Sequence, residues 1–76
     1  METKGRAPIE LFLLKYWPTL VDAAEALGVT YQAVRAWKED KPRNAFKYTL
    51  EIVALTGCDP YELYEAVKAN VDYIEE

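Results

Sequence analysis

The chain has 76 residues, a hydrophobic fraction of 51% and ten aromatic residues, which suits one compact domain and excludes a disordered chain. The net charge of −4 argues against a uniformly basic nucleic-acid-binding surface. With no histidine and a single cysteine, Cys58, the chain has neither an internal disulfide nor a Cys–His zinc site or nucleophile.

Residues 1–7 show no periodicity, and we interpret them as a flexible arm. Pro8 suits the first turn of a helix. The apolar residues that follow at helical spacing are Ile9, Phe12, Leu13 and either Tyr16 or Trp17. We expect a first helix here that Pro18 closes.

The stretch from Thr19 to Lys38 has the pattern of two short amphipathic helices that meet at Gly28. Its apolar positions, spaced by three and four, are Leu20, Ala23, Ala24 and Leu27 before the glycine and Val29, Ala33, Val34 and Trp37 after it. Glycine readily takes the positive φ that ends many helices, and Thr19 and Thr30 can cap the two helices. Two such helices joined by a short glycine-containing turn describe a helix-turn-helix, whose second helix enters the DNA major groove.

The run AAEALGVTYQAVRAW, residues 23–37, resembles the helix-turn-helix of phage Cro and repressor proteins, the lambda-repressor-like DNA-binding family. The matching features are Ala24, Leu27-Gly28-Val29, Val34 and Trp37, with a weaker match that extends the resemblance over roughly residues 10 to 57. It implies an all-α, five-helix helix-turn-helix domain. Many members begin the first of the two helices with a glutamine that contacts phosphate. This chain has Leu20 there, so Thr19 or a backbone N–H would have to make that contact.

The polar side chains left on the outer face and at the start of the second helix are predicted to read bases: Thr30, Tyr31, Gln32 and Arg35. Glutamine can bond adenine and arginine can bond guanine, each bidentately. The side chains predicted to contact phosphates are Thr19, Lys38, Lys41, Arg43, Asn44 and Lys47. The alternative interpretation is an ordinary solvated polar surface.

The charge is unevenly distributed along the chain. Residues 30–48 carry five basic residues against two acidic ones, whereas residues 49–76 carry one basic residue against seven acidic ones. An acidic region on the far side of the molecule is largely screened at physiological salt. The sequence therefore predicts one small basic face.

A fourth helix is expected from Asn44, as its cap, to Thr56, where Gly57 ends it. Its predicted inward residues are Phe46, Leu50, Val53 and Ala54.

Asp59 and Pro60, with a glutamate three residues after the aspartate, open the last helix. We predict a dimer contact at Val71, Tyr73 and Ile74, because these apolar residues lie beyond the part of the chain that a four-helix body is expected to cover. The tail is expected to be helical, with a short strand as the alternative.

These patterns predict one helix-turn-helix domain over residues 1–76, with a core at 8–68, an arm at 1–7 and a tail at 69–76. The expected protein is a Cro-like repressor that binds double-stranded DNA as a homodimer and occupies an operator. Two alternatives remain open: a helix-turn-helix used for protein contact, and a DNA-architectural or recombination accessory protein. No apolar run is long enough for a membrane span, and no glycine-rich phosphate loop is present. We expect a cytoplasmic protein with no membrane partner, no catalysis, no cofactor and no metal.

Overall fold

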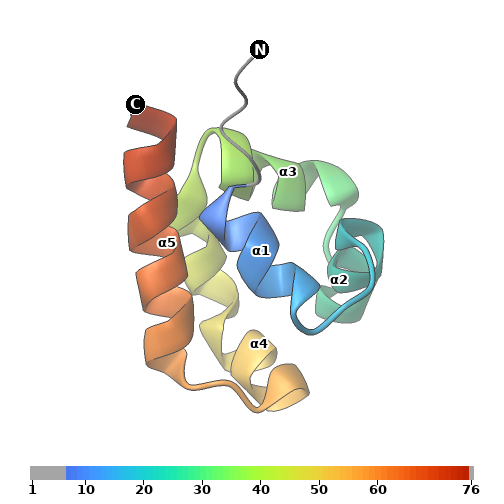
Figure 1. Cartoon of the computed structure of the whole chain (residues 1–76). Coiled ribbons are helices and arrows are strands. Elements are labelled where there is room, and N and C mark those ends of the chain that lie inside the picture. Colours follow the sequence, from blue (N-terminus) through green and yellow to red (C-terminus); the bar gives the residue numbers. More distant parts are fainter. Residues whose placement is uncertain (1–6, 76) are drawn as a thin grey trace.

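The computed structural model describes residues 7–75, which contain five α-helices, one 3₁₀ helix and, within that range, no strand. The elements are α1 (Pro8–Leu14), α2 (Leu20–Leu27), α3 (Tyr31–Glu39), η1 (Pro42–Tyr48), α4 (Thr49–Thr56) and α5 (Pro60–Glu75). The predicted all-α architecture with five α-helices is confirmed. In Figure 1, α5 lies along one side of the molecule with α1 next to it, and α2 lies on the side away from α5.

The ends of the chain differ in part from the prediction. The arm expected over residues 1–7 falls outside the described residues, apart from Ala7, which is buried at the N-cap of α1. The tail is helical as far as Glu75, so the strand alternative is wrong. The helix α1 ends at Leu14, three residues earlier than Trp17.

The early end of α1 has a visible cause in its hydrogen bonds. The backbone N–H groups of Tyr16 and Trp17 both donate to the Leu13 carbonyl, at 3.0 Å each. The regular series of α-helical hydrogen bonds therefore ends at the Leu13 carbonyl. Trp17 precedes Pro18, and the residue before a proline is sterically disfavoured in the α region.

The turn between α2 and α3 has the predicted form. Gly28 has φ +73°, its N–H donates to the Glu25 carbonyl at 3.2 Å, and the N–H of Val29 donates to the Ala24 carbonyl at 3.0 Å. This pair of bonds is the Schellman arrangement that satisfies the last carbonyls of a helix. Only three residues separate α2 from α3.

Both threonine caps are also present. Thr19 Oγ1 accepts a hydrogen bond from the backbone N–H of Asp22, and Thr30 Oγ1 accepts one from Ala33, each at 3.1 Å. Each bond satisfies one of the free N–H groups at a helix start. The two caps fix where α2 and α3 begin.

The fourth helix is not continuous, and of its predicted inward residues only Val53 packs against the core. Residues 42–48 form η1, in which Pro42, Ala45 and Tyr48 face inward at a spacing of three. Side chains three apart eclipse in a 3₁₀ helix, so the α-helical period counted from Phe46 selects the wrong residues. Phe46 and Leu50 are exposed, with Leu50 82% accessible.

After Tyr48 the chain resumes as α4, and the inward position becomes Ile52, which is completely buried. Ala54, predicted to face inward, is exposed, and Val53 is half-buried. The helix ends as expected at Gly57, whose φ is +73° and whose N–H donates to the Val53 carbonyl at 2.8 Å.

A single buried cluster forms the core between these helices. Its members include Ile9, Phe12 and Leu13 of α1, Leu20 and Leu27 of α2, Val34 and Trp37 of α3, Ile52 of α4, and Leu63 and Val67 of α5. Ala23 and Ala24 of α2 are buried and small, so they let α2 approach its neighbours closely.

Asn70 of α5 is completely buried although it lies beyond the predicted core of residues 8–68. Its Oδ1 accepts a hydrogen bond from the Ile9 N–H at 3.0 Å. Its Nδ2 donates to the carbonyls of Trp37 at 3.3 Å and Lys38 at 3.1 Å. One amide thereby joins the start of α1, the end of α3 and the middle of α5.

A second link joins α1 to the start of α5. Glu62 accepts hydrogen bonds from Lys15 Nζ at 2.8 Å and from Tyr16 Oη at 3.0 Å. These two bonds, that of Lys15 first, lower the pKa of Glu62 below its ordinary value. Asp59 caps α5 as predicted, since its Oδ1 accepts from the Tyr61 N–H at 2.9 Å.

Replacing Gly28 with valine should lower the free energy of unfolding by about 2 kcal/mol, because a branched side chain is disfavoured in the left-handed region. A Cβ at this position meets nothing within 4 Å, so the cost comes from the backbone and not from a clash. Gly28→Asn is the control, since asparagine tolerates this conformation. Urea unfolding of both variants measures the difference. Equal stability of Gly28→Val and the wild type would contradict the left-handed turn.

Candidate nucleic-acid interface

The orientation of α3 is set by its buried side. Val34 and Trp37 are 0% and 2% exposed, and the Trp37 ring contacts the Tyr48 ring with centroids 5.4 Å apart. On the opposite side, Gln32 and Arg35 are exposed, as is Thr30 at the N-cap. The structure thus places the predicted base-reading residues Thr30, Gln32 and Arg35 at the surface, at the start and on the outer face of α3.

The outer face of α3 also carries an acidic residue that the sequence analysis did not assign to it. Glu39 lies one turn after Arg35, and its Oε2 is 3.2 Å from Arg35 Nε. The hydrogen bond from Arg35 is the main reason that the pKa of Glu39 is lowered. Arg35 therefore already has an anionic partner, although both side chains are about half exposed and the pair is weak. The spacing of four between the two residues is a signal that the sequence contained.

Lys38, predicted to contact phosphate, is turned toward the body of the molecule. Its side chain is only 20% exposed, with Nζ 3.8 Å from Glu10 of α1 and 3.4 Å from Glu39. Two carboxylates thus surround this ammonium group. Of the predicted phosphate contacts on α3 and after it, Lys38 is the least available.

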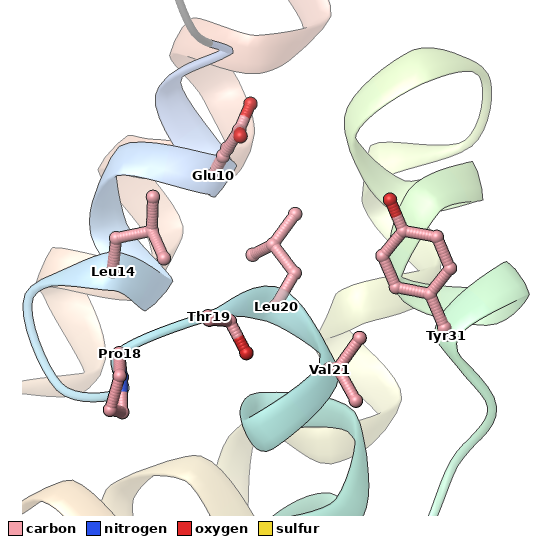
Figure 2. A pocket seen from close by; sticks show the side chains of 7 residues that line it. All are labelled: Glu10, Leu14, Pro18, Thr19, Leu20, Val21 and Tyr31. Atoms are coloured by element: carbon pink, nitrogen blue, oxygen red, sulfur yellow. The ribbon is translucent and has the colours of Figure 1, made fainter.

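Figure 2 shows a hollow of about 340 Å³ where the end of α1, the start of α2 and the start of α3 meet. Its lining residues are Glu10, Leu14, Pro18, Thr19, Leu20, Val21 and Tyr31. Thr19, a predicted phosphate contact, and Tyr31, a predicted base-reading residue, are brought to one surface in this way. Tyr31 is 41% exposed and Val21 is 49% exposed, so both present apolar area at the edge of α3.

We compared the chain with models of known protein families, with curated proteins and with solved structures, and no match was found in any of the three comparisons. The candidate interface is therefore argued from the geometry of this chain alone.

The predicted phosphate clamp after α3 has exposed cations but not the predicted cap. Asn44 does not begin a helix: it lies inside η1, and its backbone N–H donates to the Lys41 carbonyl at 3.1 Å. The side chains of Lys41, Arg43 and Lys47 are exposed and form no ion pair within residues 7–75. Any clamp at this segment depends on these side chains, because η1 starts at Pro42, which has no N–H.

Arg43 lies on the α5 side of this segment. It lines a small hollow together with Asp40, Pro42, Val71, Ile74 and Glu75. The two carboxylates in this list reduce the positive potential at Arg43. The structure does not place Arg43 in the hollow that holds Thr19 and Tyr31.

The residues predicted to form a dimer contact, Val71, Tyr73 and Ile74, are half-buried within their own chain. Tyr73 and Ile74 line a hollow with Ala7 and the end of α3. The premise that they lie beyond the reach of the domain is wrong, because α5 continues alongside the rest of the fold to Glu75. The dimer contact itself stays a prediction.

Two other kinds of site were searched within residues 7–75. No group of three or more acidic or cysteine side chains there could hold a metal ion. No helix in this range is both long and apolar enough to cross a membrane. Cys58, the one free thiol, is buried.

Proposed function

We propose that α2 and α3 form a helix-turn-helix and that the protein binds double-stranded DNA through α3, as a homodimeric transcriptional regulator that occupies an operator. The observation that carries this proposal is the exposed polar face of α3. Gln32 and Arg35 are directed outward from a short helix that is fixed on its other side by Val34 and Trp37.

The dimensions of α3 support this proposal. It has nine residues, which gives a length of roughly 14 Å at 1.5 Å per residue. With its side chains an α-helix is about 10–12 Å in diameter, which fits the major groove, about 12 Å wide. The capped N-terminus of α3 is the end from which such helices contact bases.

The electrostatic support comes from Lys41, Arg43 and Lys47, whose side chains are exposed next to the end of α3 in the chain. Phosphate contacts of this kind set the register of a protein on DNA and make its affinity depend on salt. Glu75 of α5 lies beside Arg43 and weakens the positive potential there. The effect of acidic residues more than about 8 Å from this segment is screened at physiological salt.

A second candidate function is favoured by a separate observation. Phe46 and Tyr61 are exposed, and each contacts the exposed ring of Tyr64. Exposed aromatic clusters are typical of protein interfaces. The same fold could therefore bind a protein in place of DNA.

Titration of a fluorescent random duplex separates the two functions. We expect measurable affinity at low salt, with a log–log salt slope that falls by roughly 3 when Lys41, Arg43 and Lys47 are all replaced by glutamine. Lys15→Gln, at an exposed lysine that pairs with Glu62, is the matched control and should leave the slope unchanged. Absence of binding at low salt would reject the DNA-binding function and favour the protein-binding one.

A further inference from the structure

Three of the four exposed aromatic side chains of the described chain gather where η1 meets the first turns of α5. The Phe46 and Tyr64 rings are stacked with centroids 6.2 Å apart, and the Tyr61 and Tyr64 rings meet edge to face at 5.8 Å. Tyr61 is 69% exposed. We call these three residues the aromatic patch. Burial of such rings is a large source of interface stability.

Two opposite charges lie beside the aromatic patch on α5. Glu65 follows Tyr61 by four residues, and Lys68 follows Tyr64 by four, so both lie on the same side of the helix as the tyrosines. Lys68 Nζ is 5.6 Å from the centre of the Tyr64 ring. Neither Glu65 nor Lys68 forms an ion pair within residues 7–75.

We propose that the aromatic patch, with Glu65 and Lys68, is the interface with a second copy of this chain, in which the two α5 helices pack antiparallel. A two-fold axis at the level of residues 66–67 would place each Glu65 opposite the partner's Lys68. Such a contact is isologous, because both copies use the same surface and Glu65 of each copy faces Lys68 of the other. This inference deepens the proposed function, since it rests on the dimer proposed there.

The charges favour a second copy over other occupants. The chain carries a net charge of −4, so two copies repel each other overall. At this face the repulsion is relieved, because Glu65 and Lys68 balance locally and the antiparallel arrangement pairs both of them. A DNA backbone would meet Glu65 and, about two turns further along α5, Asp72. Val71, Tyr73 and Ile74 offer less surface to a partner, since their own chain covers most of each residue.

The test is the monomer–dimer equilibrium of the free protein, measured by sedimentation equilibrium without DNA. Glu65→Lys and Lys68→Glu should each weaken dimerisation about tenfold or more, because like charges then face each other across the axis. The double variant Glu65→Lys/Lys68→Glu should restore the wild-type dissociation constant within about threefold. Circular dichroism verifies that each variant is folded. Failure of the double variant to restore dimerisation would overturn the proposed pairing.

The contribution of the aromatic patch is tested with a matched pair of substitutions. Tyr61→Glu should reduce dimerisation at least tenfold, whereas Leu11→Glu, at an exposed leucine of α1, should leave it unchanged. A wild-type protein that stays monomeric at high concentration, or a dimer that Leu11→Glu disrupts equally, would overturn the interface. Binding of a single operator half-site is measured separately. A wild-type protein that binds the half-site but stays monomeric rejects this interface and leaves the DNA-binding function standing.

Discussion

Replacing Asn70 with alanine should lower the free energy of unfolding by about 2–4 kcal/mol, because three hydrogen bonds, two of them buried, are lost at once. The Ile9 N–H is one of the free donors at the start of α1, and the Trp37 and Lys38 carbonyls are free acceptors at the end of α3. Asn70 satisfies all three from a third helix. Without its amide the Ile9 N–H and the Trp37 carbonyl stay buried and lose this partner.

Urea unfolding measures this loss, and Asn44→Ala is the matched control. Asn44 is exposed, and its substitution should change stability by less than about 0.5 kcal/mol. For a domain with a total stability of roughly 5–15 kcal/mol, the Asn70 variant should also melt at a clearly lower temperature. Equal effects of the two substitutions would contradict the role of Asn70.

The variant Asn70→Asp adds a test of burial at this position. Its carboxyl could still accept from the Ile9 N–H, but a carboxylate cannot donate to the two carbonyls of α3. Burial without a cation should raise its pKa in the folded protein above the unfolded value. The variant should therefore be most stable below about pH 4 and lose stability as the pH rises through the folded pKa. A stability difference from the wild type that is independent of pH would contradict a buried side chain.

The second large effect is expected on the outer face of α3. Arg35→Ala should cost about 1–3 kcal/mol on the preferred operator and relax selectivity at one base pair, and Gln32→Ala should do the same at another. Lys47→Ala should weaken all duplexes alike and lower the salt slope by about one unit. Fluorescence anisotropy on operator and random duplexes measures both quantities. Identical behaviour of the Arg35 and Lys47 variants on the two duplexes would contradict the division between base and phosphate contacts.

Glu39→Gln should act in the opposite direction. Removing this carboxylate frees Arg35 from its ion pair at 3.2 Å and removes a negative charge from the face that would approach DNA. The affinity for every duplex should rise, and it should rise most at low salt, where charge repulsion is least screened. Unchanged affinity at low salt would show that the outer face of α3 does not approach phosphates.

The parts of the fold that local chemistry determines could be predicted from the sequence. The threonine caps, the glycine at the end of α2 and the Asp59-Pro60 start of α5 each depend on residues a few positions apart. The break between η1 and α4 could not be predicted in this way. The inward-facing residues of this segment can be assigned with a spacing of three, as Pro42, Ala45 and Tyr48, or with a spacing of four that starts at Phe46. Packing against the rest of the core selects the first set.

For the candidate site, the sequence predicted which side of α3 is polar but not what those side chains contact. The ion pair between Lys38 and Glu10 joins two helices that are far apart in the sequence, so no local sequence pattern indicates it. The role of Asn70 is equally non-local. Asn70 continues the helical spacing of Leu63 and Val67, so the sequence places it on the same side of α5. Its three hydrogen-bond partners, however, come from α1 and α3.

The bond between Asn70 and Ile9 also constrains the order in which the chain can fold. It spans 61 residues, and contacts of such long separation close late and slow folding. During synthesis, α1, α2 and α3 leave the ribosome before Asn70 is available, so the start of α1 and the end of α3 are uncapped in the nascent chain. The helices near the N-terminus must therefore wait for the last quarter of the chain before they reach their final stability, and a chain stopped at Ala69 should be a ready substrate for proteases.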